Sequence, residues 1–135
     1  MKLITRDTDY SIRALIYIAR NNGRIVSITE LVKELDTPRP FLRKILQLLS
    51  TSGVLKSYRG KNGGFELARK PEKICLLDLM EIFQGKFKLT ECLFKKKICP
   101  NLINCELKSK LDSLGELVEN IIKEITLASL LNLNN

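Results

Sequence analysis

The sequence predicts a mainly α-helical fold with one small β-hairpin, and three observations support this prediction. Two short segments with helical periodicity, joined by a tight turn, lie near the N-terminus. A glycine-rich turn between two β-type segments follows, and a long amphipathic segment lies near the C-terminus. With 135 residues and 44% hydrophobic content, the chain can bury one ordinary core. We therefore expect one compact domain with one projecting element.

The first helix is predicted to open at Thr8-Asp9-Tyr10, and Gly23 stands just past its end. The apolar residues of this segment recur at helical spacing, which predicts a core-facing stripe made of Ile12, Leu15, Ile16, Ile18 and Ala19.

Two further helices follow after short connections. Ser27 and Glu30 have the spacing of a capping box, so a second short helix begins at Ser27. Thr37 is a suitable N-cap for a third helix, with Pro38 at its first position and Gly53 at its end. The predicted core faces are Leu31, Val32 and Leu35 in the second helix, and Phe41, Leu42, Ile45, Leu48 and Leu49 in the third.

The positive charge is concentrated in the same half of the chain as these helices. The net charge is +8, and residues 1–73 hold 15 Lys and Arg against 7 Asp and Glu, whereas residues 74–135 hold 8 of each. Two short helices joined by a tight turn in a basic segment are typical of a helix-turn-helix that binds DNA. In the third helix, Arg39 and Arg43 lie one turn apart and can reach base edges, and Lys44 can reach phosphate.

Residues 54–70 have the pattern of a β-hairpin, with a turn at Gly60-Lys61-Asn62-Gly63-Gly64. Glycine and asparagine supply the positive-φ positions that a tight hairpin tip requires. The turn lacks the spacing of a phosphate-binding loop, which disfavours a nucleotide site. Arg59 and Lys61 at the tip would enter a minor groove or contact phosphates, so the whole predicts a winged helix-turn-helix.

Three of the four cysteines lie in a loop-like stretch of the C-terminal half. Cys75 stands among aliphatic residues and is predicted to be a core residue. Cys92, Cys99 and Cys105 have the spacing C-x6-C-x5-C beside a run of lysines, and cationic neighbours favour the thiolate that metals bind. Disulfides are disfavoured in a cytoplasmic chain, and structural zinc usually has close cysteine pairs and a fourth Cys or His. An iron–sulfur cluster accepts this spacing, and three unrelated surface thiols remain the alternative.

After Cys105 the sequence predicts one helix of about 20 residues, on the order of 30 Å long. A small domain cannot readily cover such a long apolar stripe by itself, so we expect a second subunit to cover it. Packing on the chain's own core is the alternative, and Thr126 is placed to cap a last short helix through Leu133. The predicted stripe is Leu107, Leu111, Leu114, Val118, Ile121, Ile122 and Ile125.

Taken together, these segments resemble the iron–sulfur transcription regulators of the IscR and NsrR type, over nearly the whole chain. The resemblance implies a symmetric homodimer crossed by the long helices, with one cluster per subunit held by Cys92, Cys99 and Cys105, and a palindromic operator. The matching segments are Thr8-Asp9-Tyr10 with Ile12-Arg13-Ala14-Leu15, Arg59-Gly60-Lys61-Asn62-Gly63-Gly64, the cysteine triad and Ile125-Thr126-Leu127.

The fourth ligand of the cluster distinguishes the two types. IscR-like members use a histidine after the third cysteine for a two-iron cluster, but this chain has Lys108 there and no histidine. NsrR-like members complete a four-iron cluster with an aspartate of the opposite subunit, and Asp9 matches it, one residue later from the start. The resemblance therefore favours a four-iron over a two-iron cluster. Glu91 and Glu106 are rival carboxylates, and Asp9 is alternatively a first-turn acid favoured by the helix dipole.

The predicted function is a DNA-binding transcription regulator whose promoter affinity follows an iron–sulfur cluster that senses nitric oxide, redox state or iron–sulfur supply. We expect residues 1–73 to form the DNA-binding region and residues 74–135 the cluster loop and dimer helix. The alternatives are a regulator acting in its apo form or through a partner protein, and an electron carrier. An enzyme is disfavoured because the chain has no histidine to act as a general base. Without an apolar run of about 18 residues or a secretory signal, we expect a cytoplasmic protein with no membrane contact.

Overall fold

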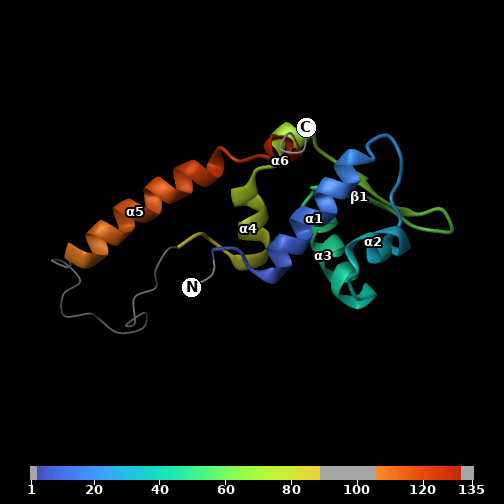
Figure 1. Cartoon of the computed structure of the whole chain (residues 1–135), viewed down its shortest axis with the longest axis horizontal. Helices are drawn as coiled ribbons and strands as arrows, with labels where there is room; N and C mark the ends of the chain where they lie inside the picture. The colour runs from blue at the N-terminus through green and yellow to red at the C-terminus, as the bar shows by residue number, and fades with distance from the viewer. Residues whose placement is uncertain (1–2, 89–105, 132–135) are drawn as a thin grey trace.

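The computed structural model describes residues 3–88 and 106–131, and its elements are those of a winged helix-turn-helix followed by a projecting helix (Figure 1). The predicted fold class, mainly α with one small hairpin, is confirmed. The elements in chain order are α1 (Arg6–Arg20), α2 (Ile28–Leu35), α3 (Arg39–Thr51), β1 (Leu55–Tyr58), β2 (Gly64–Leu67), the 3-10 turn η1 (Pro71–Lys73), α4 (Leu76–Gln84), α5 (Glu106–Lys123) and α6 (Leu127–Leu131).

The main core forms where α1 packs against α3, α4 and α6. Leu15 and Ile18 of α1 are at most 1% exposed, which confirms the core face predicted for this segment. The helix begins earlier than predicted, because Thr5 is its N-cap and accepts a hydrogen bond from the backbone N of Thr8. Other residues of this core are Ala14, Val26, Leu31, Leu42, Ile45, Leu46, Leu49, Val54, Leu55, Ile74, Leu79 and Leu127.

The predicted cap of α3 is wrong. Pro38 occupies the N-cap position without a side-chain hydrogen bond, and the Thr37 hydroxyl donates instead to the carbonyl of Leu35 at 2.8 Å. The reason is the turn itself: Asp36 ends α2 with a φ of 47°, and this left-handed residue directs Thr37 back toward α2. The α2 cap is as predicted, since Ser27 accepts from the backbone N of Glu30 at 3.2 Å.

One predicted core residue of α3, Leu48, lies on the surface with 37% exposure. Leu46 takes its place and is fully buried. The buried positions Leu42, Ile45, Leu46 and Leu49 follow an i, i+3, i+4, i+7 stripe, and Leu48 lies beside this stripe. A run of closely spaced aliphatic residues makes the choice of face ambiguous from sequence.

The predicted hairpin is confirmed, with β1 and β2 antiparallel and Leu55 opposite Leu67. Strand β2 is tied near the turn to the segment before α2, because Val26 and Phe65 exchange two backbone hydrogen bonds of 2.9 and 2.8 Å. A Cβ on Gly64 would lie 2.3 Å from the Val26 carbonyl oxygen, so this close approach requires glycine. Within the turn only Gly60 has a positive φ, 104°, so the expectation that Asn62 supplies a second such position is wrong.

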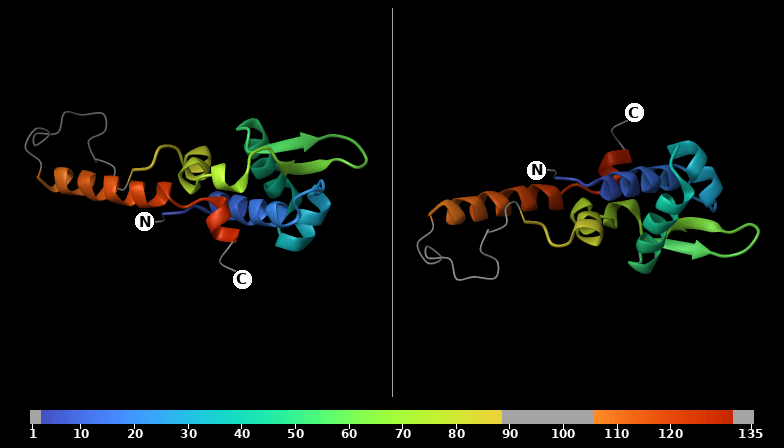
Figure 2. Two further views of the ribbon diagram at one scale, coloured as in Figure 1. Left: turned by 90° about the horizontal axis from the view of Figure 1, so that it is seen from above. Right: turned by 90° about the horizontal axis from the view of Figure 1, so that it is seen from below.

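Helix α5 and the hairpin extend from opposite ends of the body (Figures 1 and 2). The single predicted apolar stripe of α5 divides into two faces. Val118 and Ile122 pack with α4 residues in a second small core, whereas Leu107, Leu114 and Ile121 are 47 to 68% exposed. Among the residues described, no helix has the length and hydropathy of a membrane span.

Cys75 is not a full core residue as predicted. It is the N-cap of α4, is partly exposed, and its thiol donates to the Lys123 carbonyl at 3.3 Å. The position is shallow because Cys75 pairs with Thr126 in an isolated β-bridge at the edge of the body. Thr126 caps α6 as predicted, since its hydroxyl accepts from the backbone N of Ser129. Leu133, the expected end of that helix, lies outside the described residues.

Candidate DNA interface and sensor site

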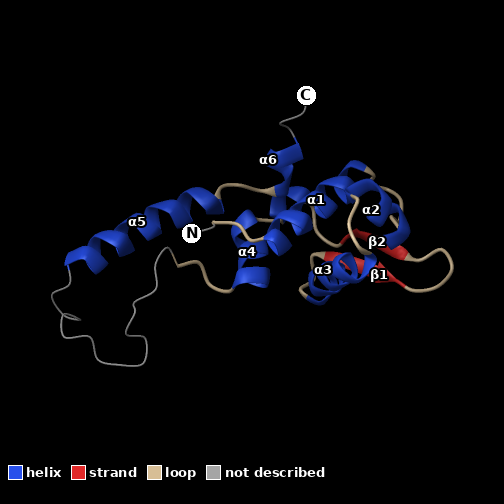
Figure 3. Cartoon of the chain, turned by 60° about the horizontal axis from the view of Figure 1, so that its bottom comes forward, coloured by secondary structure: helices blue, strands red, loops and turns tan. Residues whose placement is uncertain are grey.

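The five basic residues predicted to contact DNA are all exposed, and they come from two neighbouring elements. Arg39, Arg43 and Lys44 belong to the first half of α3, and Arg59 and Lys61 lie at the hairpin tip. Figure 3 shows α3 and the hairpin adjacent at the end of the molecule away from α5. This pairing of a helix with a projecting ribbon is suited to a major groove and the backbone or minor groove beside it.

Arg39 has a contact that the sequence does not reveal. Its guanidinium donates to the hydroxyl of Thr29 in α2 at 2.8 Å. Arg39 therefore also fixes the first turn of α3 against the preceding helix, whereas Arg43 and Lys44 make no side-chain contact of this kind within the described part of the chain.

The hairpin also carries a polar pair that sequence reasoning missed. The hydroxyl of Tyr58 donates to the carboxylate of Glu66 on the other strand. This hydrogen bond raises the pKa of Tyr58 above its ordinary value of 10.0. The pair braces the two strands just below Arg59, so it stiffens the tip that carries the basic residues.

The three predicted cluster cysteines, Cys92, Cys99 and Cys105, lie outside the described residues, as does Glu91. The described residues on either side are Lys88, after α4, and Glu106, the exposed first residue of α5. Within the residues described, no group of three His, Cys, Asp or Glu side chains could hold a metal ion.

Asp9, the predicted fourth ligand, lies in the first turn of α1. Its side chain is 47% exposed, and its Oδ2 accepts from Arg13 Nε at 3.0 Å. Asp7 lies in the same turn. The acidic first turn suits the helix dipole, so this position favours a carboxylate with or without a metal.

A partly buried network of hydrogen bonds holds the start of α1 against the end of α4. The side-chain oxygen of Gln84 accepts from the backbone N of Thr5 at 2.9 Å and from the hydroxyl of Thr8 at 2.7 Å. The amide nitrogen of Gln84 donates to the carbonyl of Leu3 at 3.1 Å. Because Gln84 is the last residue of α4, this network fixes together the turn that carries Asp9 and the point where the chain leaves α4. Periodicity carries no signal for such a contact.

The first turns of α1 and α3 meet in an aromatic and cationic cluster formed by Arg6, Tyr10, Arg13 and Phe41. The rings of Tyr10 and Phe41 pack edge to face with centroids 5.5 Å apart. The guanidinium of Arg6 lies 4.8 Å from the Phe41 centroid, and that of Arg13 lies 5.6 Å from the Tyr10 centroid. Phe41 belongs to the first turn of the predicted recognition helix, so the turn that holds Asp9 is in direct contact with the start of that helix.

Comparison with known proteins identifies the family. A model of the Rrf2 family, described as "Iron-dependent Transcriptional regulator", matches residues 4–133. The chain belongs to the Rrf2 family. An HTH-type regulator of Aquifex aeolicus is 35% identical over 126 residues, which cover 92% of this chain and 88% of that protein. The HTH-type transcriptional regulator NsrR of Bacillus licheniformis is 30% identical over 133 residues, 97% of this chain and 92% of that protein.

Solved structures of Rrf2-type regulators share the fold. IscR of T. potens has a TM-score of 0.73 and 25% identity, covering 98% of this chain and 87% of that one. CymR, the global cysteine regulator of B. subtilis, has a TM-score of 0.79 at 21% identity and covers both chains completely. The predicted resemblance to this family is thereby confirmed. The chain is a transcription regulator of a fold that binds DNA, typically as a dimer, and not an enzyme.

Proposed function

We propose that the DNA affinity of this Rrf2 regulator is set by an iron–sulfur cluster held by Cys92, Cys99 and Cys105. The description of the family as iron-dependent supports a metal. The donor set fits an iron–sulfur cluster, because three thiols occur within one short segment and thiolates are the ordinary ligands of such clusters. The chain has no histidine, so a carboxylate is the protein's natural fourth donor.

The observation that carries the proposal is the position of α5. This helix begins at Glu106, the residue directly after Cys105, and its first turn lies at the far end of the molecule from α1 (Figure 1). Asp9 of the same chain is therefore remote from the helix end that follows the cysteines. A second subunit, aligned along the exposed face of α5, would bring the first turn of its own α1 to this end of α5. This supports Asp9 of the partner subunit as the fourth ligand, with a four-iron cluster favoured, and a homodimer as the working form.

When bound, such a cluster supplies irons that react with nitric oxide and oxidants. The protein's own residues would convert this reactivity into DNA affinity. Gln84 and Thr8 hold the Asp9 turn in place, and Tyr10 and Phe41 connect that turn to α3. A helix-turn-helix dimer needs its two recognition helices about 34 Å apart, so a small tilt of α3 lowers affinity for a palindromic operator. Coupling of this kind typically amounts to about 1–3 kcal/mol.

We further propose a division of roles between the two parts of the chain. Residues 1–73 would contact DNA through Arg39, Arg43, Lys44, Arg59 and Lys61, and residues 74–135 would hold the cluster and the dimer interface. The cytoplasm is the natural compartment for this work, because thiols stay reduced there and DNA is accessible.

One contact favours a second candidate, a regulator that binds DNA in its apo form. The Asp9 carboxylate already has an ionic partner in Arg13, at 3.0 Å, so α1 has a satisfied first turn without any metal. In this case the α1 to α3 contacts would hold the recognition helix in its binding orientation regardless of iron.

The test is anaerobic purification of the wild type, Asp9→Ala and the matched control Asp7→Ala, with iron and sulfide analysis and visible spectra. We expect about four irons and four sulfides per wild-type subunit, an altered spectrum for Asp9→Ala and an unchanged one for Asp7→Ala. Glu91→Gln and Glu106→Gln test the rival carboxylates in the same way. Iron-free wild-type protein that binds operator DNA as tightly as the iron-loaded form would support the apo candidate and exclude the cluster switch.

A further inference from the structure

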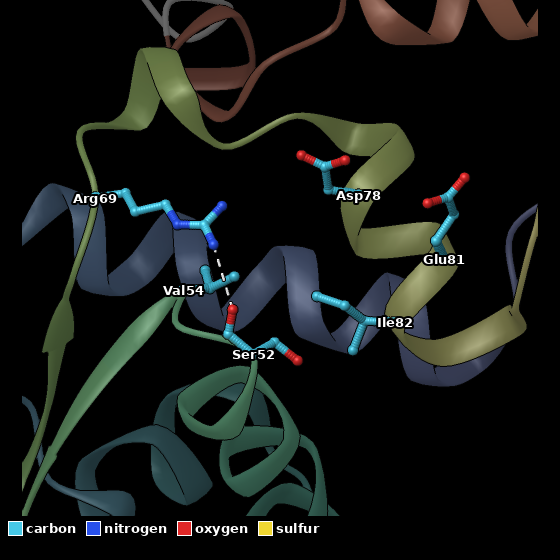
Figure 4. Close-up of a pocket in the computed structure, with 6 residues that line it drawn as sticks. All are labelled: Ser52, Val54, Arg69, Asp78, Glu81 and Ile82. Carbon is cyan, nitrogen blue, oxygen red and sulfur yellow. Dashed lines mark hydrogen bonds between the residues drawn. The ribbon is translucent and has the colours of Figure 1, made fainter.

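An open pocket of about 420 Å³ lies where the end of α3, the base of the hairpin and α4 meet. Its volume falls within the range of small-molecule sites in proteins. It contains none of the residues assigned above to DNA or to the cluster. Figure 4 shows its lining residues, which are Ser52, Val54, Arg69, Asp78, Glu81 and Ile82.

The pocket carries opposite charges on opposite walls. Arg69, just after β2, stands on one side, and Asp78 and Glu81 stand on α4 across from it (Figure 4). The two carboxylates are three residues apart, so they share one face of the helix. No ion pair within the described part of the chain joins Arg69 to either of them. The contact that Arg69 makes is with the backbone carbonyl of Ser52, at 3.3 Å.

Two aliphatic side chains, Val54 and Ile82, also line the pocket, beside the polar Ser52. Val54 is almost fully buried, with 2% exposure, and the side chain of Ile82 points from α4 toward Val54 and Ser52 (Figure 4). The pocket therefore presents a guanidinium on one side, carboxylates on the other side, and aliphatic side chains beside both (Figure 4). These groups are complementary to a molecule that carries a carboxylate, a short apolar part and an ammonium group.

We propose that this pocket binds a free α-amino acid with an aliphatic side chain. The ligand's carboxylate would accept two parallel hydrogen bonds from Arg69, a geometry in which guanidinium–carboxylate pairs are strongest. Its ammonium group would donate to Asp78 and Glu81, and its side chain would pack on Ile82.

The charges of the pocket disfavour two other ligand classes. A dianion such as a phosphate ester would meet the two carboxylates of α4, and like charges at close range repel. A polyamine would meet the guanidinium of Arg69 for the same reason. The amino acid satisfies both walls at once, and its binding site lies apart from the cluster segment, so this inference does not depend on the proposed function.

Isothermal titration of the full-length protein with L-leucine tests the proposal, with two capped analogues as probes. N-acetyl-L-leucine lacks the ammonium group, and L-leucine amide lacks the carboxylate. We expect saturable binding of L-leucine and at least a tenfold weaker Kd for each analogue, since about tenfold corresponds to one lost charge-assisted hydrogen bond.

Variants assign the binding to the pocket. We expect Arg69→Gln to lose affinity for L-leucine at least tenfold, while the matched control Lys70→Gln keeps wild-type affinity. The double variant Asp78→Asn with Glu81→Gln should also lose affinity for L-leucine. Its control, Glu72→Gln, should keep wild-type affinity. All the substituted side chains are exposed, so circular dichroism should find each variant folded.

Three outcomes would overturn the proposal. The first is no binding of L-leucine at about 10 mM, which is about ten times the Kd of a ligand that binds with about 1 mM affinity. The second is an affinity for L-leucine amide equal to that for L-leucine, which would mean that the pocket binds the ammonium group and does not recognise the carboxylate. The third is wild-type affinity in Arg69→Gln, which would move the binding elsewhere on the protein.

Discussion

Buried hydroxyl groups of this chain lie at two places that the fold must hold firmly. Thr8 and Ser11 are fully buried in α1, and Thr37 is 4% exposed in the turn between α2 and α3. Each hydroxyl has a protein partner, and no buried side-chain N or O atom of the described residues lacks one. Burying a hydroxyl without a partner costs free energy, so these bonds select one arrangement of the helix ends over others.

We predict that Thr8→Val lowers the free energy of unfolding by about 1–3 kcal/mol. The substitution keeps the shape of the side chain but removes the 2.7 Å hydrogen bond to Gln84, whose oxygen is then held by the backbone N of Thr5 alone among the described partners. Urea unfolding measures the change. Thr51→Val is the control, because its exposed hydroxyl bonds only within its own helix, and a loss as large as that of Thr8→Val would refute the assigned role of Thr8.

A second residue-scale prediction concerns pH. The hydrogen bonds from Arg24 to both oxygens of Glu30, at 3.0 and 2.7 Å, lower the pKa of Glu30 below its ordinary value of 4.5. Because the folded pKa is the lower one, the stability from this pair is fully present above pH 4.5 and is lost as pH falls through the lowered pKa.

We therefore expect Glu30→Gln to have a lower urea midpoint than the wild type at pH 7, with the difference shrinking as the pH falls below 4.5. The effect is small because both side chains are partly exposed. Glu34→Gln is the matched control on the same helix, and it should leave the midpoint nearly unchanged at both pH values. A Glu30→Gln difference that grows on acidification would contradict the expected sign of this pH dependence.

At the scale of elements, sequence patterns predicted what depends on local chemistry. The Ser27 cap, the hairpin turn and the Thr126 cap each follow from residues a few positions apart, and all three are present. The predictions that were wrong concern positions whose conformation or burial depends on residues far away in the sequence or in other elements. Asp36 and the end of α2 determine where Thr37 points, and the packing of α1 against α3 decides that Leu46 rather than Leu48 is buried. The candidate site follows the same division: basic positions were readable, whereas Gln84 and Phe41 acquire their roles only through packing.

The pairing of α3 with the hairpin leads to a prediction about how each contributes to DNA binding. Arg43→Ala should weaken operator binding by about 1–3 kcal/mol and relax sequence preference, because arginine in a major groove reads guanine edges. Lys61→Ala should weaken binding to operator and unrelated DNA alike and lower the number of released counterions by about one, because a lysine at the tip would contact phosphate.

Fluorescence anisotropy at several salt concentrations, with operator and scrambled DNA, distinguishes the two effects. Lys110→Ala is the control, since Lys110 is an exposed basic residue of α5, at the end of the molecule away from the hairpin. If this substitution weakened binding as much as Lys61→Ala, net charge rather than the hairpin would account for the affinity.

At the scale of the whole molecule, the described chain has an excess of exposed apolar surface on one element. Leu107, Leu114, Leu117 and Ile121 of α5 are 47 to 68% exposed, and they recur at steps of seven, three and four residues. This is the spacing by which one helix packs along another. The adjacent flank of the same apolar stripe, with Val118 and Ile122, already packs on α4. The described part of the chain therefore covers one flank of the stripe, and in the proposed homodimer a second copy would cover the other.

We predict that the double substitution Leu117→Glu and Ile121→Glu converts the protein to a monomer. Four charges in the assembled interface would face each other without partners, while in the monomer each carboxylate is solvated, so folding of the body is retained. Sedimentation velocity measures the oligomeric state, and circular dichroism confirms the fold. Operator affinity should fall about 100-fold or more, because two linked recognition helices bind a palindrome with an avidity that one lacks.

Leu48→Glu provides the matched control for oligomeric state. Leu48 is also an exposed leucine, at 37%, but it lies on α3, outside the α5 face, so this variant should sediment as the wild type does. A dimeric double variant of α5 would mean that subunits associate through another surface. It would also remove the argument for Asp9 of the partner subunit as a cluster ligand, because that assignment requires the second chain to lie along α5. The oligomeric state of this one variant thus bears on both the assembly and the sensor.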